Sequence, residues 1–138
     1  MNTTSKRERA RVLIADDFQP FLDRIVDLLS REFRVVGSVT NGAELISAAA
    51  SLHPDVIVVD IYMPVMNGLE AAVLLRDGGF EVPIVYMTAH HESELLDAAR
   101  KTGALGYVIK PHLAQDLVPA IRAALEGRHF VSRSVLTE

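Results

Sequence analysis

The chain has 138 residues, of which 49% are apolar and 23% are charged, and this balance is typical of one folded domain rather than a disordered segment. The formal net charge of −4 argues against general attraction to nucleic acid or to anionic membranes. Cysteine is absent, which excludes disulfides and thiolate metal sites. No apolar run approaches the roughly 20 residues that span a bilayer, and the opening MNTTSKRERA lacks a signal core, so we expect a cytoplasmic protein.

Short apolar runs rich in β-branched residues predict the strands. They do not alternate strictly between apolar and polar residues, which indicates strands that are covered on both faces, as in a parallel sheet. The predicted strands are five in number, at residues 12–15, 33–39, 56–59, 82–87 and 105–109.

Amphipathic segments between these runs predict a helix after each strand. Pro20 suits the first turn of the first helix, the pairs at 41/44 and 67/70 have the spacing of capping boxes, and Gly127 suits the end of the last helix. Right-handed crossovers then place helices on both faces of the sheet. We therefore predict an α/β fold, a doubly wound sandwich around a five-stranded parallel sheet.

Polar groups follow four of the five predicted strands. Ligands of open α/β sheets bind outside the carboxyl ends of the strands, so these groups are expected to share one crevice. A single aspartate at such a position can be only a helix cap, but the whole set is hard to explain as caps. The residues are Asp16 and Asp17 after the first strand, Asp60 after the third, Thr88 after the fourth and Lys110 after the fifth.

Three carboxylates in one crevice repel each other by roughly 3 kcal/mol per pair at about 5 Å and an effective dielectric near 20. Lys110 alone does not neutralise them, so a divalent ion is expected, and an all-oxygen site favours Mg²⁺. A carboxylate can attack phosphorus when a metal, a cation and a hydroxyl surround the phosphoryl oxygens. Asp60 as nucleophile, Asp17 as metal ligand and Thr88 as hydroxyl donor would meet these needs.

The chain resembles the receiver domains of two-component response regulators over roughly residues 10 to 127. The resemblance rests on four segments in order, IADD (14–17), VVDIYMPVMNGLE (58–70), VYMTAH (85–90) and GYVIKP (106–111). It implies the flavodoxin-like strand order 2-1-3-4-5. It also implies that a partner sensor histidine kinase, or a phosphotransfer protein, donates a phosphoryl group to this domain.

The resemblance assigns a role to each matching residue. Asp60 would be the phosphoacceptor. Mg²⁺ would be bound by Asp17, Asp60 and the main-chain carbonyl of Tyr62, with Asp16 acting through water. Lys110 and Thr88 would bind the phosphoryl group, Thr88 and Tyr107 would form the switch pair, and the Lys110–Pro111 peptide would be cis. Three residues over the pocket would tune the phosphoryl lifetime: Tyr62, Ala89 and His90.

The C-terminal stretch LVPAIRAALEGRHFVSRSVL resembles the end of NarL/LuxR-type receivers, where a linker leads to a DNA-binding domain. We therefore expect a disordered extension at 1–9, a receiver domain at 10–127 and a linker or tail at 128–138. The output would be transcription regulation through a DNA-binding domain outside this chain, with no nucleic-acid binding by the receiver itself and a possible homodimer on phosphorylation. A stand-alone regulator or phosphorelay protein is the alternative.

Other functions fit the residues less well. Haloacid-dehalogenase-type phosphatases need an acid two residues after the nucleophile, and that position holds Tyr62. A flavodoxin-like electron carrier needs a phosphate-binding loop after the first strand, where this chain has DDFQP. A degenerate receiver would lack some of the set. The adjacent His90 and His91 do not have the spacing of a helical metal-ligand pair and are expected in a surface loop.

Overall fold

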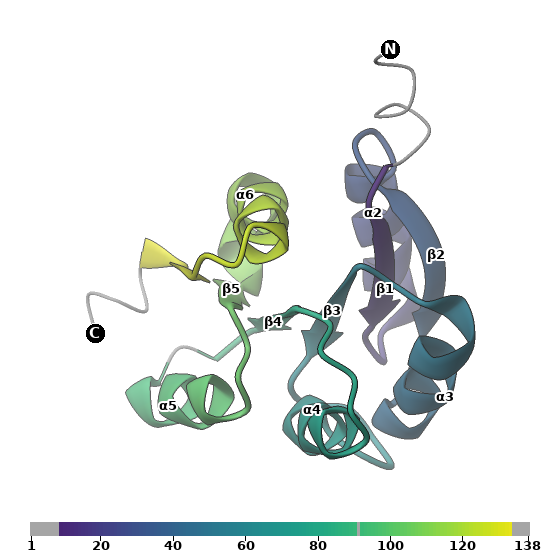
Figure 1. The fold of residues 1–138 in the computed structure, drawn as a ribbon. Helices are drawn as coiled ribbons and strands as arrows, with labels where there is room; N and C mark the ends of the chain where they lie inside the picture. The colour runs from purple at the N-terminus through teal and green to yellow at the C-terminus, as the bar shows by residue number, and fades with distance from the viewer. Residues whose placement is uncertain (1–8, 91, 134–138) are drawn as a thin grey trace.

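A computed structural model of the chain describes residues 9–90 and 92–133. Its strands form one parallel sheet with the order β2-β1-β3-β4-β5-β6 (Figure 1). The predicted order of the first five strands is therefore confirmed. The strands are β1 (Arg11–Ala15), β2 (Arg34–Val39), β3 (Val56–Asp60), β4 (Ile84–Thr88), β5 (Gly106–Ile109) and β6 (Phe130–Val131).

Helices cover both faces of the sheet, as the crossover rule requires. The three helices α3, α4 and α5 pack on one face, and α2 and α6 pack on the other. The result is the predicted three-layer sandwich. The helices are α2 (Gln19–Leu29), α3 (Gly42–Leu52), α4 (Gly68–Asp77), α5 (Ser93–Lys101) and α6 (Leu113–Leu125), with a short 3₁₀ helix η1 (Lys110–His112) before α6.

Each central strand contributes side chains to two apolar cores. In β1, Leu13 faces the core under α3, α4 and α5, whereas Val12 and Ile14 face the core under α2 and α6. The same alternation between cores continues along β3 and β4. Because both faces are apolar, the strands read as continuous hydrophobic runs, and only their ends are free to carry polar groups.

The helix signals in the sequence act as predicted, with one difference. Pro20 lies in the first turn of α2, and Gly127 has φ 76° directly after α6, a conformation that glycine adopts without strain. Asn67 and Glu70 form a complete capping box. Before α3, the Asn41 side chain accepts from the Glu44 N–H, but the Glu44 carboxylate accepts from Thr40 instead of from Asn41.

The sheet has one strand more than the five predicted, because a sixth strand follows α6. Phe130 and Val131 lie in the segment expected to be a linker or tail, but they pair in parallel with Gly106 and Tyr107 of β5. The two side chains pack against opposite cores. The strand has only two residues between polar neighbours, and an apolar run this short does not predict a strand. Part of the segment 128–138 is therefore built into the sheet.

Two other expectations fall mainly on residues outside the described ranges. Of the proposed extension 1–9, the structure describes only Arg9, whose guanidinium donates to the Ser30 carbonyl at 3.3 Å. Val135, Leu136 and His91 also lie outside the described residues. Within those ranges, no helix is both long enough and apolar enough to span a bilayer.

Candidate functional site

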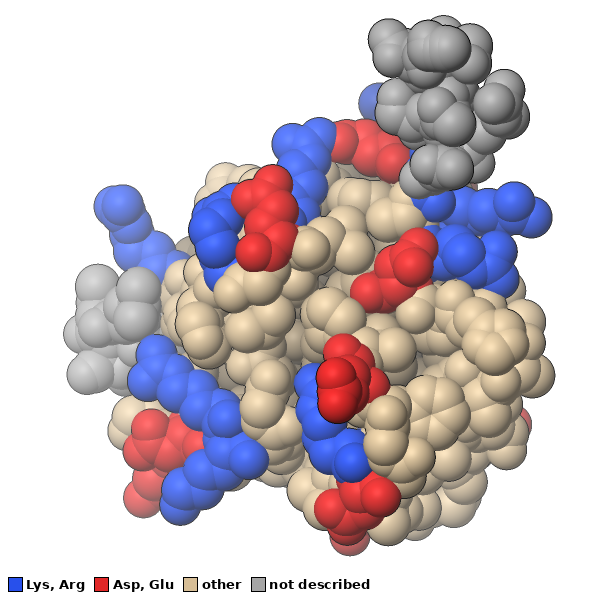
Figure 2. Space-filling view, viewed as in Figure 1, with Lys and Arg blue, Asp and Glu red and all other residues tan. Residues whose placement is uncertain are grey.

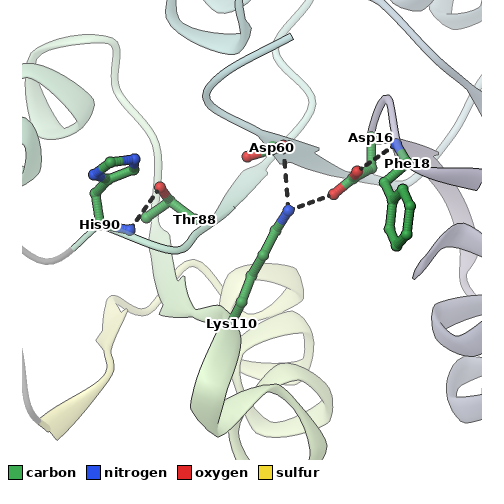
Figure 3. A network of polar contacts seen from close by, with 6 residues as sticks. All are labelled: Asp16, Phe18, Asp60, Thr88, His90 and Lys110. Carbon is green, nitrogen blue, oxygen red and sulfur yellow. Dashed lines mark hydrogen bonds and ion pairs between the residues drawn. The ribbon is translucent and has the colours of Figure 1, made fainter. Parts of the chain in front are cut away.

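The carboxyl ends of four strands bring the predicted polar residues to one edge of the sheet. Asp16 directly follows β1, Asp60 and Thr88 are the last residues of β3 and β4, and Lys110 directly follows β5 (Figure 3). Asp60 pairs in register with Met87, one residue before Thr88. The parallel register therefore places side chains that are far apart in the sequence around one pocket, as predicted.

The Lys110 side chain extends across this pocket and joins two of the acids (Figure 3). Its Nζ lies 2.8 Å from Oδ2 of Asp16 and 3.2 Å from Oδ2 of Asp60. The other Asp16 oxygen accepts from the Phe18 N–H at 2.9 Å, which fixes the orientation of that carboxylate. The pairs are charge-assisted and largely shielded from water, which strengthens them relative to surface ion pairs.

The Asp60 carboxyl is buried, with 6% of the residue exposed. This burial raises its pKa from 3.8 to about 6, since desolvation penalises the charged form, and the nearby Asp16 charge adds to the effect against the opposing pull of Lys110. For Lys110, burial alone would lower the pKa, but the hydrogen bond to Asp16 and the charges of both acids raise it overall. Lys110 therefore remains a cation at neutral pH, and Asp60 is mostly ionised.

Asp16, Asp17 and Asp60 form a cluster that we call the acidic pocket. One carboxylate oxygen from each residue lies within 4.8 Å of the others. Asp16 and Asp60 are buried, whereas Asp17 is exposed, so the pocket opens to solvent on one side. Oxygen ligands with several places left for water fit a hard divalent cation such as Mg²⁺, and burial of Asp60 makes its charge costly unless a cation lies beside it.

Comparisons with known proteins agree with this geometry. The family model for the response regulator receiver domain matches residues 12–122. The chain belongs to the response regulator receiver family. It is 35% identical over 133 residues to the nitrate/nitrite response regulator protein NarL of Escherichia coli, covering 95% of this chain and 62% of that protein. It is 34% identical over 116 residues to the transcriptional regulatory protein PdtaR of Mycobacterium tuberculosis, covering 83% and 56%.

Solved structures show the same fold. A two-component response regulator of the LuxR family from an Aurantimonas species superposes with a TM-score of 0.90 at 30% identity, covering 94% of both chains. The signal receiver domain of the response regulator NarL from Mycobacterium tuberculosis gives 0.83 at 29% identity, covering 87% of this chain and 98% of that one. These relatives support a NarL/LuxR-type receiver. The chain spans about six tenths of the length of the E. coli NarL and M. tuberculosis PdtaR proteins.

The loop between β3 and α4 of this receiver is held by close backbone contacts. The Gly68 N–H donates to the Ile61 carbonyl at 2.7 Å, and the Gly42 N–H donates to the Met66 carbonyl at 3.0 Å. A Cβ on Gly68 would lie 2.4 Å from the Asp60 carbonyl oxygen, so only glycine fits there. The loop carries Tyr62, whose main-chain carbonyl as a metal ligand stays a prediction.

The predicted switch pair meets at the loop that follows β4. Thr88 is fully buried, and its hydroxyl accepts from the His90 N–H at 3.1 Å. The Tyr107 ring is 2% exposed, and its hydroxyl donates to the His90 carbonyl at 3.2 Å. Burial, followed by the charge of Glu92, raises the pKa of Tyr107, so this hydroxyl stays a donor. In this structure the ring is already turned inward.

Two of the three predicted tuning residues touch each other at the rim of the pocket. The rings of Tyr62 and His90 meet edge to face, with centroids 4.8 Å apart. Both residues are exposed, as is Ala89. His90 Nδ1 lies 3.7 Å from a Glu92 carboxylate oxygen. His90 thus lies on the surface, as expected, and its partners here are a ring and a carboxylate.

The predicted cis peptide between Lys110 and Pro111 was wrong, since the described residues contain no cis peptide bond. Lys110 begins the 3₁₀ turn η1, and Pro111 lies in its first turn. A helical turn is built from trans peptides, and proline at such a position loses no needed hydrogen bond. The chain therefore passes from β5 into α6 without the expected isomer.

One neighbour of the site was missed. The ring of Phe21, at the start of α2, lies beneath the Lys110 ammonium, with Nζ 4.5 Å from the ring centroid. The sequence shows an apolar residue in the first turn of an amphipathic helix, and such a residue is normally part of the core. Only the shared position of the β1 and β5 ends could have placed this ring near the lysine.

Proposed function

We propose that Asp60 is the phosphoacceptor of this receiver domain. A carboxylate oxygen of Asp60 attacks the phosphorus of a donor phosphohistidine and forms an acyl phosphate. The P–N bond breaks, and its electron pair returns to the imidazole nitrogen. At neutral pH Asp60 is mostly ionised, because its raised pKa is still about 6, so the nucleophile is available. Lys110, 3.2 Å from Asp60, supplies positive charge where the phosphoryl oxygens arrive.

The acidic pocket would hold Mg²⁺ through Asp17, Asp60 and the Tyr62 main-chain carbonyl, with Asp16 acting through water. When bound, the metal neutralises the negative charge that develops on the phosphoryl oxygens. The support is the set of three carboxylates within 4.8 Å. Thr88 would donate its hydroxyl to the phosphoryl group, giving up the His90 N–H that it accepts from in this structure.

The output would be a change in the surface around β4 and β5. Thr88 and Tyr107 both bond to His90, so moving Thr88 toward a phosphoryl group would release one end of the loop after β4. Phosphorylation would then shift an equilibrium between two arrangements of that loop. Tyr62, Ala89 and His90, at the rim, would set how easily water reaches the phosphoryl group.

The whole protein would regulate transcription, with a sensor histidine kinase or phosphotransfer protein as donor. The support is the similarity to NarL and PdtaR, both named as regulators. Solved RcsB, 25% identical to this chain, forms dimers bound to DNA, and by analogy this domain would form a homodimer on phosphorylation. The visible face mixes both signs of charge (Figure 2), which favours DNA contact through another domain. A stand-alone regulator remains the second candidate.

The chain would act as a phosphoryl carrier in the cytoplasm and not as a turnover phosphatase. The family that it matches is a signalling family and not an enzyme family. Tyr62 occupies the position two residues after Asp60, where a phosphatase of the haloacid-dehalogenase type has its general acid. The boundaries of the receiver, 10–127, with a linker from 128, are proposed on the same resemblance, although β6 adds residues 130–131 to the sheet.

Exposure to acetyl phosphate and Mg²⁺ tests the assignment. The wild type should gain the mass of one phosphoryl group, and Asp60→Asn should gain none, because an amide does not form the acyl phosphate. Asp77→Asn, at the exposed end of α4, is the matched control and should be labelled like the wild type. Undiminished labelling of Asp60→Asn would overturn the proposal.

A further inference from the structure

The Lys110 ammonium has three close partners among the described residues. Two are the carboxylate oxygens of Asp16 at 2.8 Å and Asp60 at 3.2 Å, and the third is the Phe21 ring, whose centroid lies 4.5 Å away. An ammonium group has three N–H donors, and the face of an aromatic ring attracts a cation at this distance. Two N–H bonds of the ammonium therefore serve the carboxylates, and the ring face attracts its positive charge.

The Phe21 ring is held in place by regular structure. It lies in the first turn of α2, where its own N–H donates to the Phe18 carbonyl at 3.0 Å. The next turns of the helix anchor it to the sheet through Leu22, Ile25 and Leu29, all buried. Phe21 itself is only partly buried, at the border of the core under α2 and α6. Its free face is therefore presented to the pocket by a rigid helix.

A divalent ion and the Lys110 ammonium would compete for the same carboxylates. Asp16 and Asp60 belong to the acidic pocket, and both are also the ion-pair partners of Lys110. Metal binding weakens the hold of these carboxylates on the lysine, and acyl phosphate formation removes the charge of Asp60. The Phe21 ring is a ligand of neither the metal nor the phosphoryl group, so it stays available to the Lys110 ammonium.

We propose that Phe21 is a positioning residue that keeps the Lys110 ammonium at the pocket while the metal and then the phosphoryl group take over its carboxylate partners. This inference rests on the proposed phosphoacceptor function. The ring attracts the cation without donating or accepting a hydrogen bond of its own. Lys110 can then turn its N–H bonds from the carboxylates to a phosphoryl oxygen without leaving the site.

A purely structural role for Phe21 makes a different prediction. If the ring only filled space between α2 and the sheet, its loss would loosen the end of β1 and disturb Asp16 and Asp17. The apparent affinity for Mg²⁺ would then fall together with the rate. A positioning role acts on Lys110, so the rate should fall while Mg²⁺ affinity is kept.

The test compares Phe21→Leu, Phe21→Tyr and Phe80→Leu in the full chain. Leucine keeps an apolar side chain without a π face, and tyrosine restores the π face. Phe80 is the matched control, since it is also partly buried and packs on a core but lies before β4, away from the strand ends that form the pocket. At saturating Mg²⁺ and acetyl phosphate, Phe21→Leu should be phosphorylated about three- to tenfold more slowly, the range that a cation–π contact supports. Phe21→Tyr should stay within about twofold of the wild type because it keeps the π face, and Phe80→Leu should do so because it does not touch Lys110.

Two further readouts separate the possible outcomes. The Lys110 ε-protons should show an upfield ring-current shift in NMR spectra that Phe21→Leu loses and Phe21→Tyr keeps, and the apparent Mg²⁺ affinity of Phe21→Leu should be unchanged. A wild-type rate in Phe21→Leu, or an equal loss of rate and Mg²⁺ affinity, overturns the positioning role while the phosphoacceptor assignment stands. If the wild type itself gains no phosphoryl group, both the positioning role of Phe21 and the phosphoacceptor assignment of Asp60 are overturned.

Discussion

At the scale of single residues, Asp60 shows how a buried strand end changes a carboxylate. Its neighbours on β3 are apolar and its exposure is 6%, so little water solvates the charge. Lys110 and Asp16 then act on it in opposite directions. The ionised Asp60 carboxylate therefore costs free energy in the folded protein. A bound cation would reduce this cost, and formation of the acyl phosphate would remove the charge of the carboxylate.

The pH dependence of stability follows from this residue. Folding raises the Asp60 pKa from 3.8 to about 6, so its contribution to stability is fully present below pH 3.8 and is lost as the pH rises through about 6. In metal-free buffer, Asp60→Asn should therefore be more stable than the wild type at pH 7, by on the order of 2 kcal/mol. The difference should vanish near pH 4.

Urea melts of both proteins between pH 4 and pH 8, with a chelator present, measure this difference. Asp77→Asn, which replaces an exposed acid, should follow the wild type over the whole range. A variant that gains no stability at pH 7, or whose advantage grows toward pH 4, would contradict the role of burial.

Much of the site was predictable from single residues, because the carboxyl ends of parallel strands share one edge. That rule places Asp16, Asp60, Thr88 and Lys110 together without any coordinates. It does not specify which way a long side chain bends. The contact of Lys110 with the Phe21 ring depends on the rotamers of both side chains, which have no sequence signal, although Pro20 marks the first turn of α2.

At the scale of elements, β6 is the addition that the sequence did not reveal. It is anchored by Ser132, which is fully buried. The Ser132 hydroxyl accepts from the Ile109 N–H at 3.1 Å and donates to the Asp116 carboxylate of α6 at 2.8 Å. The Ser132 N–H donates to the Tyr107 carbonyl at 2.9 Å. One side chain thus joins the end of β5, the segment after β6 and the last helix.

Replacing Ser132 with alanine should lower the free energy of unfolding by about 2–3 kcal/mol, because the buried Ile109 N–H loses its acceptor and Asp116 loses a donor. Ser47→Ala, at an exposed position on α3, is the control and should change stability by no more than about 0.5 kcal/mol. Urea denaturation measures both. Equal stability of the two variants would show that the Ser132 contacts do not hold the segment.

A helix or strand is well predicted from the sequence when its own residues form an apolar run or a periodic apolar pattern. Five strands were predicted from apolar runs and their order from a family resemblance, and both are confirmed. The prediction for the fourth strand ended at residue 87, one short of Thr88, because threonine is polar although β-branched. The two-residue β6 is specified by pairing with β5 and by Ser132, which are long-range contacts that periodicity does not report.

At the scale of the whole molecule, the pocket ties the two ends of the fold together. Asp16 and Lys110 are separated by 94 positions in the sequence, yet their ion pair joins the end of β1 to the end of β5. A ligand that needs both strand ends in place binds the native state and not the unfolded chain. Its binding therefore stabilises the native state.

Mg²⁺ should therefore raise the melting temperature of the wild type. At ten times its dissociation constant, a ligand specific for the native state adds about 1.4 kcal/mol, which for a chain of this size corresponds to a shift of about 5 °C. Asp60→Asn loses one carboxylate ligand and should shift less at the same Mg²⁺ concentration. Thermal melts with NaCl at matched ionic strength are the control, and equal shifts in both proteins would point to binding elsewhere.

The short sixth strand also bears on how chains of this protein meet one another. Unpaired strand edges are templates for aggregation, and proteins protect them by keeping edge strands short or irregular. In the described part of the sheet, β6 caps β5 with only two residues, and at the opposite border β2 joins β1 with a register shift. Neither border offers a long, flat ladder to a second molecule, so self-assembly of this domain should proceed through helical faces, while β6 covers the outer side of Gly106 and Tyr107.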